Sequence, residues 1–319
     1  MVFIARAAAP MFPVCVVPIS TKLSSRFMGG KCKSLTQPRP IFRLQFNPLP
    51  NHHLRKPNAM NPMQNIGVRA ARAAGRVITK NMGRLDSLRI EKKGHNDFAS
   101  EVDKEAEAEV VETLLKAYPD HGIVGEENGQ LGNADSDFQW IVDPLDGTMN
   151  YLHGYPHFSV SIALYEKGRP SQAVVYDPVR QELFTGGKGE GAYLDGKRIR
   201  VSGASRLADA LVGYTYPYKQ GGDLTAPLAT LKVLTENSAG VRREGSAALD
   251  LAYIAAGRLD GAWMTGLKPW DFAAGALLVR EAGGLINDFQ GGDTWMDSGS
   301  FVAGSPKVHH EILQSLKPS

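Results

Sequence analysis

Apolar residues recur at helical spacing in two stretches of the chain. After Asn61 and Pro62, which suit the N-cap and first turn of a helix, apolar residues follow every three or four positions, and Gly83 can end the pattern. A second helical pattern covers residues 101–117 and stops before Pro119. The buried face of this second helix is predicted to contain Val102, Ala106, Val110 and Leu114.

Apolar runs separated by Gly, Pro and Asp-Gly turns predict strands through the middle of the chain. These runs are residues 121–124, 138–142, 159–165, 172–176, 182–185 and 192–194. The last third alternates between strand and helix patterns instead. Strands are predicted near 211–214, 241, 263 and 285, and helices near 224–236 and from 246, 271 and 305. Such alternation is typical of layered proteins of the α/β class.

Charge divides the chain into a basic tail and an acidic body. The 319 residues carry 36 Lys and Arg against 33 Asp and Glu, but residues 1–59 contain nine of the bases and none of the acids. Residues 60–319 therefore hold 27 bases and all 33 acids, a net charge of −6. The positive total consequently does not indicate a nucleic-acid-binding protein, and no direct nucleic-acid contact is predicted.

The tail shows no periodicity, and residues 1–59 are predicted to be disordered. They contain 8 of the 19 prolines, and an acid-free leader with Arg and Ser is compatible with an organelle transit peptide. The alternative is that Met60 is the true initiator and the upstream stretch is an over-extended reading frame. A peptide spanning residues 55–65 in the mature native protein would exclude a start at Met60.

Composition removes several other classes of protein. No run approaches the roughly 18 uninterrupted apolar residues of a membrane helix, so no membrane partner is expected. A cytoplasmic location is predicted unless the tail is a genuine import leader. Both cysteines, Cys15 and Cys32, lie in the tail. The body therefore has no disulfide framework and no thiolate nucleophile or metal ligand.

Three acidic clusters lie after predicted strands or at a predicted helix start, where open α/β sheets bind ligands. They are Glu126-Glu127, Asp143-Pro144-Leu145-Asp146-Gly147-Thr148 and Trp270-Asp271. In the second cluster, carboxylates at positions i and i+3 around a turn at Pro144 can point toward one centre, and the carbonyl of Leu145 adds a neutral oxygen. Such oxygen ligands suit Mg²⁺, and the N–H groups of Gly147 and Thr148 would hold an anion. Two such ions could clamp a phosphoryl transfer.

Each cluster also has a purely structural interpretation. Asp-Pro-x-Asp-Gly is a good turn sequence, Asp271 could be a helix N-cap, and Glu126-Glu127 could be a solvated loop. Asp97 and Asp103 could be acids of a first helical turn. Four histidines show no paired metal-ligand spacing and receive no role: His95, His121, His153 and His157.

Taken in order, these clusters resemble the inositol monophosphatase family, and most closely its bacterial SuhB-type branch. The resemblance rests on residues 125–127, 143–148 and 270–271, with supporting matches at 93–98, 245–250 and 281–284, and it covers essentially all of 60–319. It implies a layered αβαβα sandwich, usually a homodimer. It also implies one catalytic domain over 60–319, with lobes of about 60–200 and about 201–319. The family's enzymes are Mg²⁺-dependent, Li⁺-inhibited phosphatases.

The resemblance also implies roles for individual residues. Two or three Mg²⁺ ions would be bound by Glu126, Asp143, Leu145 through its carbonyl, Asp146 and Asp271. Thr148 and Asp103 would orient the attacking water, with Glu126 as the base partner. The phosphate and the alcohol would be contacted by Gly147, Thr148, Arg242, Gly245, Ser246 and Ala247. Lys93 and Asp97 would belong to an accessory loop that helps to assemble the metals.

One position departs from the family members that prefer inositol phosphates. Those relatives carry a glutamate shortly before Trp-Asp, where this chain has Met264. A thioether cannot accept strong hydrogen bonds from two ring hydroxyls. We therefore expect weaker inositol selectivity, acceptance of other small polyol and sugar phosphates, and a gain in discrimination from Met264→Glu.

The predicted activity is Mg²⁺-dependent hydrolysis, by metal-activated water, of inositol 1-phosphate or a related small polyol or sugar phosphate. One alternative is a sugar bisphosphatase or a nucleotide 3′-phosphatase, for which Arg242, Arg243 and Lys268 would supply positive charge. The other alternative is a transcription antitermination partner, in which the outer surface binds a transcription-elongation protein and catalysis is secondary.

Overall fold

The computed structural model describes residues 60–94, 97–216 and 223–316. The prediction for residues 1–59 concerns a segment outside this described part. The side chains of Lys93 and Asp97 also lie outside it, so their accessory role stays a prediction.

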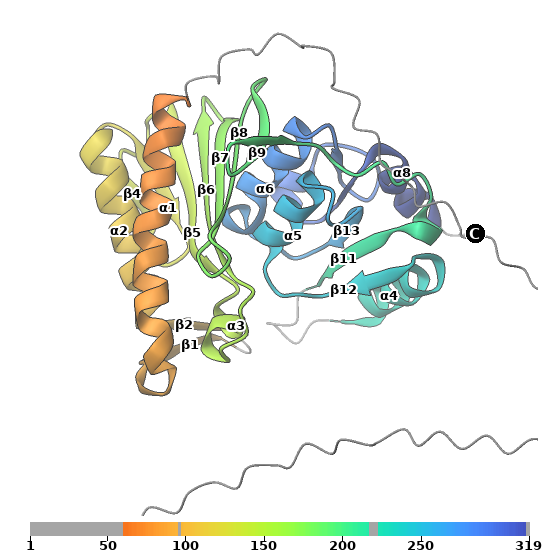
Figure 1. Cartoon of the computed structure of the whole chain (residues 1–319), viewed down its shortest axis with the longest axis horizontal. Coiled ribbons are helices and arrows are strands. Elements are labelled where there is room, and N and C mark those ends of the chain that lie inside the picture. Colours follow the sequence, from red (N-terminus) through yellow and green to blue (C-terminus); the bar gives the residue numbers. More distant parts are fainter. Residues whose placement is uncertain (1–59, 95–96, 217–222, 317–319) are drawn as a thin grey trace, which may run out of the picture. The chain divides into compact units, whose positions relative to one another are not determined.

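Helices and sheets alternate in five layers, which confirms the predicted αβαβα sandwich (Figure 1). The outer face of the larger sheet is covered by α1 (Pro62–Asn81) and α2 (Glu101–Ala117). Between the two sheets lie α5 (Ala247–Ala255) and α6 (Pro269–Glu281). The far face of the smaller sheet is covered by α4 (Thr225–Asn237) and α8 (Pro306–Ser315). The short helices are α3 (Thr148–Leu152) and α7 (Trp295–Ser298), with 3₁₀ turns at Met82–Ser87 and Leu207–Asp209.

The larger sheet has eight strands in the order β10-β9-β8-β7-β6-β5-β3-β4, and only the β3–β5 pair is parallel among its described strands. These strands are β3 (Gly122–Gly125), β4 (Gly129–Gly132), β5 (Phe138–Asp146), β6 (Ser159–Glu166), β7 (Arg169–Asp177), β8 (Glu182–Gly187), β9 (Gly191–Leu194) and β10 (Lys197–Ile199). The smaller sheet has the order β12-β11-β13-β15-β14. Its strands are β11 (Leu211–Thr215), β12 (Gly240–Arg242), β13 (Gly261–Met264), β14 (Leu285–Asn287) and β15 (Phe301–Gly304). A separate hairpin joins β1 (Ile90–Gly94) and β2 (Asp97–Ser100).

The first two helices form where the sequence predicts them. The Asn61 side chain caps α1 by accepting the N–H of Met63 at 2.9 Å, and Pro62 is the first helical residue. The α2 helix covers the predicted residues. Its predicted apolar face is fully buried against the larger sheet, at Val102, Ala106, Val110 and Leu114.

Residues 143–146 are the end of β5 and not the turn that their sequence predicts. Asp143 pairs with Ser161 and Asp146 pairs with Ser159, so three steps along β5 oppose two steps along β6. This extra residue is a β-bulge, which is expected where Pro144 has no N–H to donate to the ladder. In a regular strand, residues i and i+3 point to opposite faces. The bulge brings both carboxylates to one side instead.

The two central helices pack closely and thereby place two segments of the site. A Cβ atom on Gly275 of α6 would lie 2.5 Å from Cβ of Leu251 on α5, so glycine is required for this approach. Both helices are lined by fully buried alanines and leucines. The N-termini of α5 and α6 are therefore held firmly beside the end of β5. Within the described chain, no helix has the length and apolarity needed to cross a bilayer.

Candidate metal centre

The acidic residues predicted to bind metal converge at the end of β5. One carboxylate oxygen each of Asp143, Asp146 and Asp271 lies within 4.8 Å of the others. Glu126 follows β3, which runs parallel to β5, and its side chain hydrogen-bonds Asp143. Glu126 is therefore part of the cluster, and the Glu126-Glu127 segment is not simply a solvated loop. Asp271 is the third residue of α6 and not its N-cap, and its Oδ2 accepts the N–H of Lys268 at 2.7 Å.

Burial and mutual repulsion make this cluster unfavourable while it is fully charged. Loss of solvent, followed by repulsion from Glu126, Asp146 and Asp271, raises the pKa of Asp143 well above its usual range. Burial also raises the pKa of Asp146 to about 6, even though the Ser246 hydroxyl and the Ala248 N–H donate to its Oδ2. Divalent cations would remove both penalties. An all-oxygen donor set fits Mg²⁺ better than softer metals.

A network beside the cluster holds the Thr148 hydroxyl in one orientation. Thr148 Oγ1 donates to Asp103 Oδ1 at 2.8 Å and lies 3.1 Å from the Leu145 carbonyl oxygen. Asp103 Oδ2 accepts the N–H and the hydroxyl of Ser100 at 2.8 and 2.6 Å. Asp103 is thus the first-turn acid that its position suggests, and it also reaches the predicted site.

The predicted phosphate and alcohol residues lie together next to these groups, with one exception. Gly147 has φ of +102°, and a Cβ there would lie 3.1 Å from the His157 carbonyl oxygen, so the backbone needs glycine. Gly245 faces the Asn150 side chain, and Ser246 caps α5, which begins at Ala247. The exception is Arg242, which is exposed. Its Nη1 donates to the Val241 carbonyl at 3.1 Å and not to the described acids.

Met264 is fully buried in the core between the sheets. The structure therefore shows that Met264→Glu would also lower the stability of the fold. A glutamate at this position would have to bury its carboxylate, which is unfavourable without a partner. Rates on several substrates consequently test selectivity better than Met264→Glu does.

Two residues that shape the site received no role from the sequence. Glu107 of α2 is fully buried, and its carboxylate accepts the N–H groups of Glu127 and Asn128, each at 2.9 Å. It thereby fixes the loop that carries Glu126. An acid on the apolar face of a helix was the available signal. Asn150 donates from Nδ2 to two carbonyls at 2.7 Å, and neither contact is local in sequence.

Glu107→Gln is expected to weaken Mg²⁺ binding about 10- to 100-fold, because an amide cannot accept both N–H groups and still satisfy its own buried N–H donors. The measurement is the dissociation constant of Mg²⁺, obtained by calorimetric titration. Glu109→Gln is the matched control, since Glu109 lies on the exposed face of the same helix. Equal Mg²⁺ dependence in the two variants would show that Glu107 does not position the loop.

Comparisons with known proteins show the family of this chain. A family model described as the inositol monophosphatase family matches residues 59–318. The Nus factor SuhB of Escherichia coli strain K12 is 50% identical over 258 residues, which cover 81% of this chain and 97% of that protein.

Two solved structures extend the agreement to three dimensions. The extragenic suppressor protein SuhB from Bartonella henselae aligns with a TM-score of 0.78 and 40% identity, over 81% of this chain and 100% of its own. The inositol monophosphatase from Anabaena (Nostoc) sp. PCC 7120 aligns with a TM-score of 0.69 and 38% identity, over 79% of this chain and 94% of its own.

Proposed function

We propose that this chain, which belongs to the inositol monophosphatase family, hydrolyses a small phosphate monoester with Mg²⁺-activated water. One observation carries the proposal: three carboxylates from β5 and α6 meet within 4.8 Å of one another. Together with Glu126 they form a partly buried anionic centre that favours divalent cations. A role as a turn or a cap explains none of this convergence.

The ligand sets overlap at Asp143. Glu126, Asp143 and the Leu145 carbonyl would hold one ion, and Asp143, Asp146 and Asp271 would hold a second. Glu126 is also the residue available to a third ion. When bound, Mg²⁺ neutralises the phosphate, lowers the pKa of water and stabilises the leaving oxygen.

The chain's own groups would orient the reactants. The Thr148 hydroxyl donates a hydrogen bond to Asp103, so the lone pairs of Oγ1 are free to accept a hydrogen bond from water. Such a water directs its own lone pair away from Thr148, toward the phosphorus atom, while Glu126 accepts its proton. Backbone N–H groups at Gly147 and Thr148 would bind the phosphate, and the residues around Ser246 would face the alcohol.

Thr148→Val is expected to lower kcat about 100-fold, because valine keeps the shape of threonine but cannot accept a hydrogen bond from the water. Thr148→Ser keeps the hydroxyl and should retain most of the rate. Both are measured as phosphate release at saturating substrate and Mg²⁺. If the valine and serine variants turn over equally, the hydroxyl does not orient the nucleophile.

The proposed substrates are inositol 1-phosphate and related small polyol or sugar monophosphates, with weak discrimination among them. Rates on a panel of esters at varied Mg²⁺, with and without Li⁺, test the function. We expect Mg²⁺-dependent, Li⁺-inhibited release of phosphate from monoesters, with inositol 1-phosphate and glycerol 2-phosphate used within about tenfold of each other. A clear preference for a sugar bisphosphate or a nucleotide 3′-phosphate would favour the bisphosphatase alternative.

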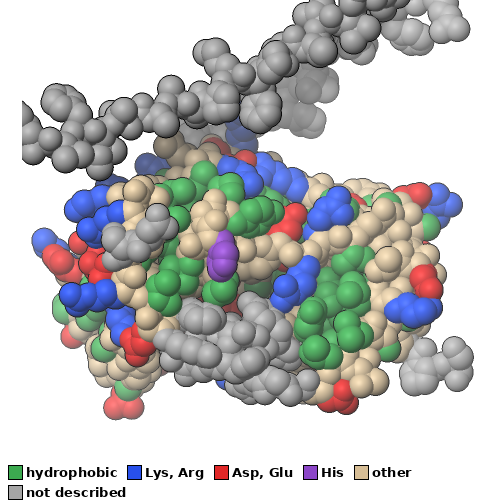
Figure 2. All heavy atoms as spheres, turned by 90° about the horizontal axis from the view of Figure 1, so that it is seen from below, with side chains coloured by type: hydrophobic (Ala, Val, Ile, Leu, Met, Phe, Trp, Pro, Cys, Tyr) green, Lys and Arg blue, Asp and Glu red, His purple; other side chains and the backbone are tan. Residues whose placement is uncertain are grey.

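A second role is supported by the name of the E. coli relative, which is a Nus factor. We propose that the outer surface binds a protein of the transcription machinery and that the chain forms a homodimer. On the face seen in Figure 2, basic, acidic and hydrophobic side chains are interspersed, which suits a protein partner better than a phosphate backbone. A pull-down with Asp271→Asn separates the roles, since a partner retained by an inactive variant does not depend on catalysis.

A further inference from the structure

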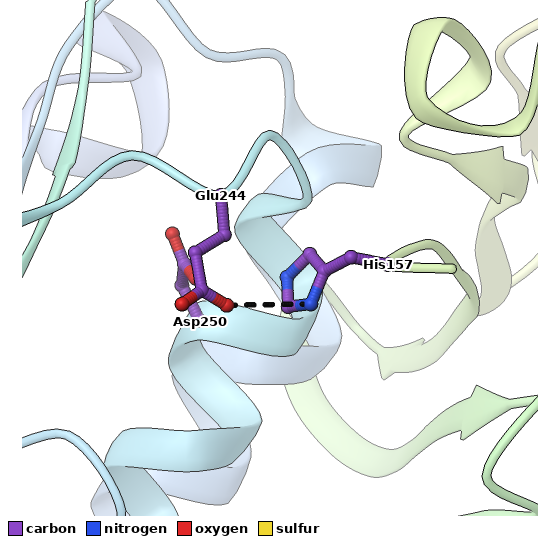
Figure 3. Close-up of side chains that lie close together, drawn as sticks. All are labelled: His157, Glu244 and Asp250. Carbon is purple, nitrogen blue, oxygen red and sulfur yellow. Dashed lines mark ion pairs between the residues drawn. The ribbon is translucent and has the colours of Figure 1, made fainter. Parts of the chain in front are cut away.

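A second group of metal-ligating side chains lies apart from the catalytic carboxylates. His157 lies shortly before β6, Glu244 lies in the loop before α5, and Asp250 lies in the first turn of α5. Figure 3 shows the three side chains pointing toward one another, with His157 reaching across from the β6 side. One ligand atom of each lies within 4.8 Å of the others, and His157 Nδ1 lies 3.3 Å from Glu244 Oε2.

Two members of this group, Asp250 and His157, have buried polar atoms without hydrogen-bond partners among the described residues. Asp250 is fully buried, and neither of its carboxylate oxygens has a hydrogen-bond partner among the described residues. His157 Nε2 is also buried and has no hydrogen-bond partner among the described residues. Leaving a buried carboxylate without any donor is costly, so two unsatisfied oxygens indicate a missing ligand.

The nearby charges do not compensate the two carboxylates. Repulsion from Glu244 and Asp146 adds to burial in raising the pKa of Asp250 well above its usual range. Arg180 is the cation near His157, but its guanidinium is bound to Asp177 at 2.8 Å and to the Pro156 carbonyl at 2.9 Å. A bound cation would supply the positive charge that this cluster lacks.

The backbone segments that carry two of these side chains are tied together independently of any ligand. Asn150 Nδ2 donates to the carbonyls of both His157 and Glu244 at 2.7 Å. Because Asn150 belongs to α3, three segments are joined at this point. The site is therefore prearranged, with the partly exposed Glu244 side chain as its adjustable member.

We propose that His157, Glu244 and Asp250 bind a divalent cation of the Zn²⁺ class. One imidazole nitrogen with two carboxylates suits Zn²⁺ and its first-row neighbours, whereas Mg²⁺ prefers oxygen ligands alone. Donors around a tetrahedral ion with bonds of about 2.1 Å lie about 3.4 Å apart. His157 Nδ1 and Glu244 Oε2, 3.3 Å apart, already have this spacing. The third ligand atom lies within 4.8 Å of the others, and side-chain rotation would have to bring it closer.

This cation would link the β6 side of the larger sheet to the start of α5. Ser246 and Ala248, at that start, donate to Asp146. The cation would therefore have a structural role at the start of α5, and its binding would not depend on the proposed reaction.

The test uses tag-free, full-length protein carrying Asp143→Asn and Asp271→Asn, so that Zn²⁺ retained by the catalytic centre does not obscure the result. This protein is incubated with Zn²⁺, desalted and analysed for metal by mass spectrometry. We expect one tightly held Zn²⁺ per chain, lost on adding His157→Gln or Asp250→Asn and retained with His310→Gln, since His310 is exposed. The visible spectrum of the Co²⁺-loaded protein should change with the same variants.

Two results would overturn the proposal: no retained Zn²⁺ in the starting protein, or equal retention after His157→Gln. If the added variants fail to fold, anomalous diffraction at the zinc edge from the starting protein decides. A peak between His157, Glu244 and Asp250 supports the site, and the absence of a peak there refutes it.

Discussion

Asp143→Asn is expected to lower kcat/KM for phosphate esters about a thousandfold or more while leaving the fold intact. Asp143 belongs to both proposed ligand sets, and an amide in its place removes the negative charge that holds the ions and hence the charge stabilisation they give the transition state. The measurement is Mg²⁺-dependent phosphate release together with circular dichroism and thermal melting.

The stability of this variant distinguishes a functional acid from a structural one. Burial raises the pKa of Asp143, so its carboxylate destabilises the metal-free protein near neutral pH. The metal-free variant should therefore melt at the same temperature as the wild type or higher. Asp137→Asn is the control. Asp137 is exposed, and within the described residues its ion pair is with Lys167, at 3.9 Å. Near-normal turnover by Asp143→Asn, or a large drop in its melting temperature, would contradict the assignment.

Mg²⁺ is expected to stabilise the wild-type protein strongly and to lose this effect in Asp143→Asn. At a concentration about 100 times the dissociation constant, binding adds roughly 2.7 kcal/mol to the free energy of unfolding. For a folded body of this size that corresponds to about 5–10 °C in melting temperature. An unchanged melting temperature in the wild type would show that the carboxylates do not bind Mg²⁺.

The gain from Mg²⁺ should also depend on pH, with a sign fixed by the raised pKa values. The pKa of Asp146 is about 6 in the folded protein against 3.8 as its reference value, so between these values the folded state binds more protons than the unfolded state. The metal-free protein consequently loses stability as pH rises through this window. Mg²⁺ replaces the protons, so its stabilising effect should be larger at about pH 7.5 than at about pH 5. Melting curves at both values, with and without Mg²⁺, measure the difference.

The sequence was most informative where the controlling interactions are local. The α2 helix and its buried face follow from the spacing of Val102, Ala106, Val110 and Leu114, which all became fully buried. The acids proposed to bind metal are indicated by their place after predicted strands and by the resemblance to a known family. The bulge at Pro144 was not predicted, because it depends on pairing between β5 and a strand that begins at Ser159. An isolated Asp-Pro sequence is compatible with either a turn or a bulged strand.

Interactions between distant segments account for the remaining differences. Glu107 acts on Glu127 and Asn128, about twenty residues further along, so its role could not be read from α2 alone. His157 shows no paired ligand spacing because Glu244 and Asp250 lie far along the chain, in the loop before α5 and in α5 itself. Met264 was treated as a pocket residue, and only the packing between the two sheets shows that it belongs to the core.

The most direct test of the account is anomalous diffraction from crystals of the wild-type protein soaked with Mn²⁺, which replaces Mg²⁺ at oxygen sites, together with inorganic phosphate. The account places at least two manganese peaks among Glu126, Asp143, Asp146 and Asp271, with phosphate beside Gly147 and Thr148. Crystals that show no anomalous density between these carboxylates, at a manganese concentration that supports turnover in solution, would contradict it.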